Sequence, residues 1–410
     1  MRLPSRLAAL ADRNFRLLFI GQSLSNLGDQ MTPVAITFAV LNHHGNARQV
    51  GDVLGAGTAA MVIFLLFGGA VADRLPRRLV MLSADALRFV VQSAVAVLLF
   101  TDHVSVLALA LLSAAWGAGA AFFNPAMTGL LPQLLSGEEL QAANALRGIS
   151  LALGGVIGPA IAGGLVALGG AGSAVAVDAA SFAISALTLV RLAVSHQART
   201  GATSMLRDLR EGWDSFISRR WLWSIVAEFG LWHLVVLAPL FVLGAVVAKD
   251  ELGGATAWGL ILASFGLGSV LGGILALHWR PRRPLYVATL ATLPFVPVPA
   301  LFAIPAPVPV IVVVIFIGGA GFAVFGTQWE TTMQNEVPPE VLSRVSAYDW
   351  LGSTALLPAG FLIAGPIAAA IGIKVALWSS SIACLVLTLA VLAVRDVRDL
   401  PRRELRPKVS

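Results

Sequence analysis

The chain has 410 residues, of which 57% are hydrophobic and only 12% are charged, and it carries a net charge of +6. Soluble globular proteins have about 25% charged residues, so this composition leaves too little polar surface to coat a water-soluble body. The mean hydropathy of +0.84 indicates a polytopic membrane protein instead. A single cysteine, Cys384, excludes an intramolecular disulfide and a cysteine metal cluster.

Apolar runs that are long enough to cross a bilayer, which takes about 20 residues, recur along the whole chain. The predicted spans lie near 15–41, 50–72, 79–100, 105–127, 141–168, 172–194, 221–247, 256–279, 285–303, 309–333, 343–369 and 371–394. The ninth is the least regular, because Pro294, Pro297 and Pro299 must kink or shorten it. The first run is too long for a signal peptide and is interpreted as a retained span. The sequence therefore predicts an all-α membrane protein with twelve transmembrane helices.

Basic residues gather on one side of these predicted spans. The opposite loops hold only Arg48, Lys249 and Lys374. Because the basic side of a membrane protein stays in the cytoplasm, both termini are predicted to be cytoplasmic. The same distribution explains the positive net charge without a nucleic acid as partner.

A long polar stretch between the sixth and seventh spans divides the chain. Apolar residues recur in it at spacings of three and four, at Leu206, Leu209, Trp213 and Phe216. This pattern predicts a cytoplasmic amphipathic helix at the membrane surface, and a solvated linker is the alternative. The predicted domains are an N-terminal six-helix half at 1–194, the linker at 195–220, a C-terminal six-helix half at 221–394 and a tail at 395–410.

The two halves repeat each other at a fixed offset of 202 residues. Matching pairs are Phe123 with Phe325, Glu138 with Glu340, Gly158 with Gly360 and Gly163 with Gly365. Two parallel six-span repeats are typical of transporters whose substrate site lies near the midplane, where the repeats meet. The repeat therefore predicts a transporter.

The stretch GGAVADRLPRR at 68–78 has the spacing G-x-x-x-D-R-x-x-R-R. It resembles the signature loop of the major facilitator superfamily, although Pro76 stands where glycine is usual. Gly69 is expected to permit close helix approach. The resemblance implies a cytoplasmic gate whose aspartate faces the N-terminal end of span eleven, where the helix dipole favours an anion, and whose arginines hold the outward-facing state. The expected gate residues are Gly69, Asp73, Arg74, Arg77, Arg78 and Glu330. A generic basic loop is the alternative.

A second motif, GGVIGPAIAGG, lies in span five. Its glycines at Gly154, Gly158 and Gly163 remove side chains where helices pack tightly, and Pro159 bends the span. The motif resembles the glycine–proline motif of exporting, antiporter-type facilitators, with three residues instead of two between Gly-Pro and Gly-Gly. Plain helix packing is the alternative.

Further stretches extend the resemblance over nearly the whole chain, among them NLGDQMT, LQAANALRG and GTQWETTMQNEVPPEVLSRV. They are similar to the branch that contains bacterial macrolide-type drug efflux proteins and enterobactin (siderophore) exporters. The resemblance implies a secondary active transporter of the bacterial inner membrane that exports amphipathic small molecules by proton antiport with alternating access. Span four lacks the arginine found in another branch of proton-coupled exporters, so coupling through that residue is not implied.

Asp29 places a carboxylate near the middle of the first span, where insertion costs about 2.5–3.5 kcal/mol. Gln22, Asn26, Asp29 and Pro33 form one helical stripe, which must face a protein interior or a water-filled cavity. Asp29 could therefore carry protons, contact substrate or only brace the helix. Glu228 in span seven could act with it or stabilise the cytoplasmic interface. The aromatic candidates for the cavity wall are Trp116, Phe123 and Trp232.

Other charged residues in the spans have simpler interpretations. Asp85 and Arg88, three residues apart, are interpreted as a pair within one helix. Arg147 and Asp349 occupy matching repeat positions and could pair across the halves. Asp178 is expected to form hydrogen bonds between helices.

The expected partners are a small amphipathic substrate, protons and membrane lipid, and the protein is expected to be a monomer with no cofactor and no metal site. A siderophore exporter or a lysophospholipid flippase of the same fold is the nearest alternative. A membrane enzyme is disfavoured, because the sequence has no HExxH motif, P-loop or nucleophile triad. A transport-dead sensor is the remaining alternative.

Overall fold

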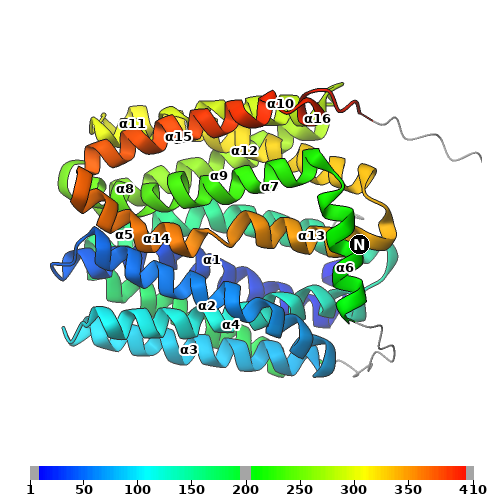
Figure 1. Cartoon of the computed structure of the whole chain (residues 1–410). Coiled ribbons are helices and arrows are strands. Elements are labelled where there is room, and N and C mark those ends of the chain that lie inside the picture. Colours follow the sequence, from blue (N-terminus) through cyan, green and yellow to red (C-terminus); the bar gives the residue numbers. More distant parts are fainter. Residues whose placement is uncertain (1–8, 194–204, 403–410) are drawn as a thin grey trace, which may run out of the picture. The chain divides into compact units, whose positions relative to one another are not determined.

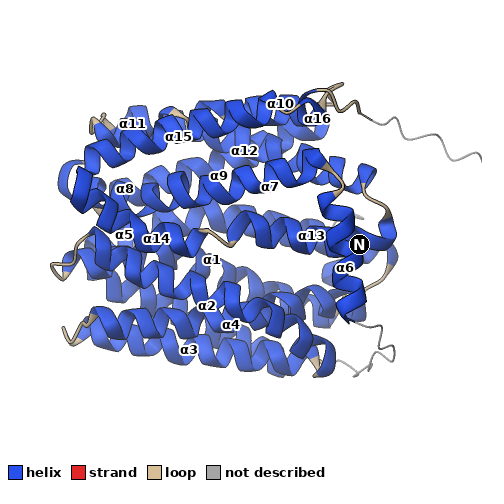
Figure 2. Cartoon of the chain, in the orientation of Figure 1, coloured by secondary structure: helices blue, strands red, loops and turns tan. Residues whose placement is uncertain are grey.

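The computed structural model describes residues 9–193 and 205–402, which form helices and loops with no strand among them (Figure 2). The first helices are α1 (Arg13–Asn42), α2 (Ala47–Arg74), α3 (Arg77–Phe100), α4 (Val106–Leu134) and α5 (Gly137–Val190). The others are α6 (Met205–Ile217), α7 (Arg220–Trp232), η2 (His233–Leu237), α8 (Ala238–Glu251), α9 (Ala255–His278), α10 (Pro284–Ala291), η3 (Leu293–Phe295), α11 (Pro297–Ala303), α12 (Val308–Glu336), α13 (Pro339–Thr354), α14 (Leu357–Ile371), α15 (Ile373–Ala393) and α16 (Arg395–Arg398). The predicted all-α class is confirmed.

The chain forms two compact units. Unit 1 comprises residues 1–200, 241–263 and 361–370, and unit 2 comprises residues 201–240, 264–360 and 371–410. In unit 1, helices α2, α3 and α4 pack side by side (Figure 1). The apolar core of unit 1 joins α1, α3, α4 and α5, and a second core in unit 2 joins α7, α10, α12, α13 and α15.

Helix α5 reverses direction within its length. Gly170 has a φ of +75°, a left-handed conformation that glycine adopts without strain. One arm contacts α1 where Gly154 meets Asn26, and the other arm contacts α1 where Asp178 meets Gly28. Because both contacts lie at the same level of α1, the two arms form a hairpin that encloses α1. The arms thus correspond to the fifth and sixth predicted spans.

Glycines let α2 and α4 approach each other closely in unit 1. A Cβ on Gly117 would lie 2.0 Å from the carbonyl oxygen of Gly57, and a Cβ on Gly68 would lie 2.2 Å from that of Ala121. Gly69, in contrast, has open space beside it. The expectation that Gly69 permits the close approach was therefore wrong by one residue, because the signature motif does not indicate which of two adjacent glycines faces the neighbouring helix.

Prolines divide the ninth predicted span in unit 2. Helix α10 ends at Ala291, the short 3₁₀ segment η3 contains Pro294, and α11 begins at Pro297. Proline removes a backbone donor and clashes with the preceding turn, so the predicted irregularity is confirmed.

The amphipathic helix predicted in the linker is present as α6. Trp213 and Phe216 of α6 contact Tyr348 of α13, with ring centroids 5.4 Å and 6.0 Å apart, and Arg344 of α13 forms a 2.8 Å ion pair with Glu211. Its aromatic side chains therefore pack against α13, where the sequence predicted a membrane surface. The linker up to residue 204, the tail from residue 403, and the side chains of Leu206 and Leu209 lie outside the described residues.

Helical segments of the described ranges have the length and composition of membrane spans. Nine are apolar and long enough, and one of them, Glu139–Val190, contains both arms of α5. At 1.5 Å per residue its 52 residues would extend about 78 Å, far beyond a bilayer core of about 30 Å. Helices α1 and α2 are also long enough, with 30 and 28 residues, but more polar. The pattern agrees with the twelve predicted spans.

Replacing Gly117 by alanine should destabilise the packing of α2 against α4. The added methyl would overlap the Gly57 carbonyl, and overpacking of this kind costs about 1–3 kcal/mol. We expect a lower thermal unfolding temperature for Gly117→Ala in detergent. Gly164→Ala is the control, because its Cβ meets open space. Equal stability of the two variants would contradict the close packing.

Candidate functional site

Unit 1 contains a cavity of about 310 Å³ whose walls are mostly apolar. The apolar lining includes Phe15, Phe19, Met61, Trp116, Phe123 and Met127. All four members of the predicted stripe on α1, Gln22, Asn26, Asp29 and Pro33, also line it. The 3.6-residue period of α1 places them on one face. This face supplies part of the polar lining, to which Arg88 of α3, Asn124 of α4 and Arg147 of α5 add further polar side chains.

Asp29 has two carboxylate oxygens in different surroundings. Its Oδ2 atom lies 3.4 Å from Nη1 of Arg88 on α3. Its Oδ1 atom is buried and has no hydrogen-bond partner among the residues that the structure describes. The side chain as a whole is 28% exposed. A buried oxygen without a donor is costly in an ionised carboxylate, so this oxygen is a place for a proton or for a donor group of a ligand.

Arg88 is the cation at the centre of the site and is only 3% exposed. Its guanidinium lies between the rings of Phe123 and Phe182, at 4.5 Å and 4.3 Å from their centroids. Such cation–π contacts contribute about 2 kcal/mol or more when they are desolvated. Gly119 of α4 gives room for the arginine stem, because a Cβ there would lie 3.0 Å from its Cγ atom. The guanidinium is therefore fixed on both faces.

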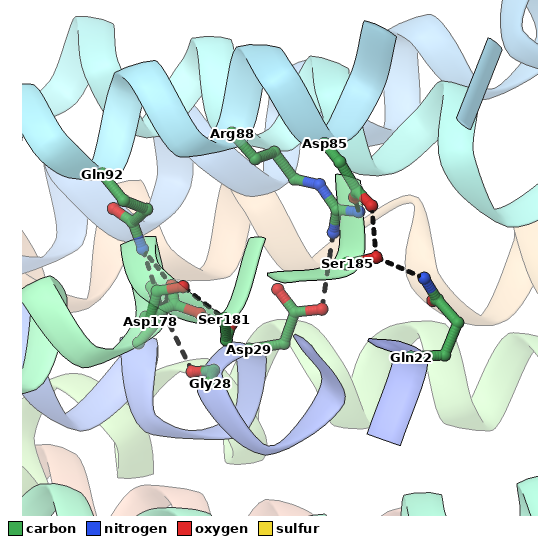
Figure 3. A network of polar contacts seen from close by, with 10 residues as sticks. Gln22, Gly28, Asp29, Asp85, Arg88, Gln92, Asp178, Ser181 and Ser185 are labelled. Carbon is green, nitrogen blue, oxygen red and sulfur yellow. Dashed lines mark hydrogen bonds and ion pairs between the residues drawn. The ribbon is translucent and has the colours of Figure 1, made fainter. Parts of the chain in front are cut away.

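Asp85 binds the same arginine and is completely buried. Its Oδ1 atom accepts a 2.5 Å hydrogen bond from Nη2 of Arg88. Its Oδ2 atom accepts a hydrogen bond from Ser185 of α5, whose hydroxyl accepts another from Gln22 of α1 (Figure 3). The predicted pair within α3 is thus present, but it belongs to a chain of contacts that joins α1, α3 and α5.

Asp178 forms a second polar cluster beside the first. Thr32 of α1 donates to its Oδ2 atom at 2.7 Å. Gln92 of α3 donates to the same atom at 2.5 Å (Figure 3). Ser181 donates to the backbone carbonyl of Asp178. Gly28 is required opposite, since a Cβ there would lie 2.2 Å from the carboxylate. The predicted interhelical hydrogen bonds are present, and they fix α1 against α3 and α5.

Glu228 and Trp232 belong to unit 2. Both line a recess of about 10 Å³ with Thr289, Thr292 and Thr388. The side chain of Glu228 is buried, and its Oε2 atom has no hydrogen-bond partner within the described chain. Trp232 packs against Phe322, with ring centroids 5.0 Å apart. The recess is about the size of a single water molecule, so it cannot hold a drug-sized ligand.

The signature-loop residues have varied surroundings. Arg78 donates to the carbonyls of Leu189 and Val190 at the end of α5, and Arg77 donates to the carbonyl of Gly129. Arginine commonly satisfies carbonyls at helix ends in this way. Arg74 and Glu330 are exposed. The side chain of Asp73 lies outside the described residues, and the predicted gate remains a prediction.

The motif glycines of span five lie at close contacts in unit 1. Cβ atoms on Gly154 and Gly158 would lie 2.3 Å from the Asn26 side chain and 2.7 Å from that of Gln30, both on α1. A Cβ on Gly163 would lie 2.6 Å from the carbonyl of Ala255 on α9. Pro159 is buried beside them. These positions favour helix packing, and their link to export stays a prediction.

Arg147 and Asp349 lie in different units. Arg147 lines the cavity of unit 1 and has no ion-pair partner among the described residues. Asp349 accepts a 3.1 Å hydrogen bond from Trp329 in unit 2. Their pairing across the halves stays a prediction. Within the described ranges, no group of three or more His, Cys, Asp or Glu side chains could hold a metal ion.

A sequence profile of the transmembrane secretion effector family matches residues 4–408. The chain belongs to this family, which is a branch of the major facilitator superfamily. The multidrug efflux pump Tap of Mycolicibacterium fortuitum is 26% identical over 398 residues, which cover 94% of this chain and 96% of Tap. The enterobactin exporter EntS of Shigella boydii is 26% identical over 336 residues, which cover 81% of this chain and 80% of EntS. The predicted resemblance is confirmed.

Solved structures show the same fold. This major facilitator chain matches the nucleoside transporter NupG with a TM-score of 0.73 and 14% identity, covering 93% of this chain and 98% of that one. A bacterial homologue of the iron transporter ferroportin, in an inward-facing state, matches with a TM-score of 0.71 and 20% identity, covering 93% of this chain and 98% of that one. A bacterial homologue of the human lysosomal transporter Spinster matches with a TM-score of 0.73 and 15% identity, covering 99% of this chain and 100% of that one. The chain therefore has the major facilitator fold.

Replacing Arg88 by methionine should destabilise this transporter strongly. Removing one partner of a buried ion pair leaves an uncompensated charge, here on Asp85, at a cost of about 3–5 kcal/mol. We expect a lower unfolding temperature in detergent for Arg88→Met and a smaller loss for Arg88→Lys, which keeps the charge but lacks the planar group. Arg191→Met, at an exposed position, is the control. Wild-type stability of Arg88→Met would contradict the ion pair.

Proposed function

We propose that this chain exports amphipathic small molecules in exchange for protons, and that Asp29 is the carboxyl group at which the two compete. The observation that carries the proposal is the position of Asp29, in the wall of an aromatic cavity, with one oxygen on Arg88 and the other without a donor. A proton or a cationic group of a substrate can each satisfy that second oxygen. Both cannot occupy it together, which is the requirement for exchange.

The cavity walls support the proposed substrate class. Ligand sites are concave and mostly apolar, with a few polar groups that fix orientation. Here Trp116 and Phe123 offer aromatic faces, while Gln22 and Asn26 offer amide groups beside Asp29. A substrate with a flat apolar body and one positive group matches this arrangement. The similarity to the multidrug efflux pump Tap supports the same class.

Transport follows from alternating access. The proposed halves at 1–194 and 221–394 rock about the midplane and expose the site to each side in turn, as in other proteins built from six-span repeats. The proposed cytoplasmic gate uses the signature loop around Asp73 and Arg74. A proton that binds from outside displaces the substrate, and a substrate that binds from inside displaces the proton.

The setting of this transport is a bacterial inner membrane, with both termini in the cytoplasm and a monomer surrounded by lipid. The bias of basic residues supports this orientation. Apolar side chains such as Phe67 and Leu107, which are 60% and 69% exposed, support contact with lipid tails. The relatives Tap and EntS are bacterial proteins.

Asp29→Asn should abolish proton-driven export while the protein still folds, because asparagine keeps the shape of the side chain but neither gains nor loses a proton. The test follows efflux of the fluorescent amphipathic cation ethidium from bacteria that express each variant, with and without a protonophore. We expect the rate of Asp29→Asn to equal the rate of wild type treated with protonophore. Asp250→Asn, at an exposed carboxylate, should behave as wild type. Retained protonophore-sensitive efflux in Asp29→Asn would refute the assignment.

A siderophore exporter is the second candidate, and Arg147 is the residue that favours it. Arg147 lines the cavity without an ion-pair partner in the described chain, and siderophores are rich in anionic oxygens. EntS, an enterobactin exporter, is also similar over most of the chain.

Arg147→Ala separates the two candidates. If the substrate is a siderophore, the variant should lose its secretion from iron-starved cells, because a desolvated arginine–anion contact is strong and planar. Ethidium efflux should then be absent in wild type as well. Undiminished ethidium efflux in Arg147→Ala, together with no siderophore secretion by wild type, would reject the second candidate.

A further inference from the structure

The two carboxylates that face Arg88 are unequal. Asp85 lies 2.5 Å from the guanidinium and is fully buried, whereas Asp29 lies 3.4 Å away and is partly exposed to the cavity. Ser185 also donates to Asp85, so Asp85 is fixed from a second helix. Asp29 has no corresponding donor on its second oxygen within the described chain. Arg88 therefore forms a close ion pair with Asp85 and a longer, weaker one with Asp29.

The charges of Asp29, Asp85 and Arg88 do not balance. With both carboxyl groups ionised, Asp29, Asp85 and Arg88 together carry one net negative charge. The helices around Asp29 add few other charged groups: Asp178 on α5, which has its own hydrogen-bond donors, and Arg147, which lines the same cavity. The cavity residues from α2 and α4 are uncharged, and include Met61 and Trp116. Neither Asp178 nor Arg147 forms an ion pair with Asp29 or Arg88 among the described residues, so the group of Asp29, Asp85 and Arg88 itself lacks one positive charge.

We propose that Asp85 sets the coupling of transport by holding Arg88, so that Asp29 lacks one positive charge that only a proton or a cationic substrate supplies. Asp85 is a positioning residue, since it acts on Asp29 through Arg88. This inference rests on the proposed function, and in it the Asp85–Arg88 ion pair is the interaction that makes exchange obligatory.

The physical reason is the cost of net charge in a desolvated site. Moving an unbalanced ion out of water is unfavourable even after relaxation, so the empty, ionised site resists the closure that reorientation requires. Either a proton or a substrate cation removes this penalty. Without Asp85, the guanidinium of Arg88 would form an ion pair with Asp29 alone. That pair is neutral with nothing bound, so the empty transporter could reorient.

Proton release on ligand binding tests this inference. Purified protein in weakly buffered detergent solution is mixed with ethidium, and a pH indicator records the protons released per ethidium bound. Wild type should release about one proton, because coupling requires the two to exclude each other. Asp29→Asn should release none. Asp85→Asn should also release none near neutral pH, because Arg88 then holds Asp29 ionised before the ligand arrives.

A charge rescue separates this role from a structural one. In the double variant Asp85→Asn with Arg88→Gln, Asp29 again lacks one positive charge, and proton release should return to about the wild-type value. Replacing both partners of a buried pair costs far less stability than removing one. Asp85→Glu keeps the charge and should also release a proton. These two variants carry the test if Asp85→Asn does not fold.

Asp178→Asn is the matched control, because it removes an equally buried carboxylate that forms no ion pair with Arg88 within the described chain. It should lower stability and still release about one proton per ethidium. The inference is overturned if Asp85→Asn releases protons as wild type does, or if the double variant and Asp85→Glu both release none. Wild-type protein that binds no ethidium, or binds it without releasing a proton, overturns the proposed function itself.

Discussion

The ion pair between Arg88 and Asp85 is the interaction on which the rest of unit 1 depends. A guanidinium that is 3% exposed in a membrane-spanning helix needs a counter-charge within hydrogen-bond distance, and Asp85 supplies it from one helical turn away. The rings of Phe123 and Phe182 cover its two faces. Of its other nitrogens, Nη1 lies 3.4 Å from Asp29, and Nε has no hydrogen-bond partner among the described residues. The positive charge available to that carboxylate is therefore set by a pair on a neighbouring helix.

The surrounding helices are arranged so that this pair can form. The hairpin of α5 encloses α1, and the tight fit at Gly28 brings α1 close enough for Thr32 to reach Asp178. On the other side, Gly119 of α4 gives room for the arginine stem. Glycine is the residue that permits such close approach between transmembrane helices. The close packing at these glycines is thus what allows the charged and polar side chains to reach one another.

Much of the fold followed from patterns along single helices. The spacing of Gln22, Asn26 and Asp29 predicted one polar face, and these residues do line one cavity. Pro294 and Pro297 predicted the break in the ninth span, because a missing backbone donor acts locally. In both cases the decisive physics lies within a few residues of sequence.

The contacts that define the candidate site could not be obtained in this way. A spacing of three residues suggests that Asp85 and Arg88 satisfy each other, and it cannot reveal that Arg88 also reaches Asp29, which is 59 positions away. Gln92 and Ser185 carried no signal, since isolated polar residues in apolar spans are common. The nearest clue was the absence of arginine from span four, which left Arg88 of span three and Arg147 of span five as the candidate central cations. The expectation that Gly69 permits a close helix approach failed for a related reason, because the rotation of α2 is set by its neighbours.

The proposed competition between a proton and a substrate cation at Asp29 is most directly tested with purified protein in liposomes that contain a trapped pH indicator. The liposomes are loaded with ethidium and diluted into ethidium-free buffer, so that the only driving force is the ethidium gradient. Exchange predicts that the lumen acidifies as ethidium leaves, and that a protonophore abolishes the pH change. Ethidium efflux through the protein with no change in internal pH would contradict the exchange.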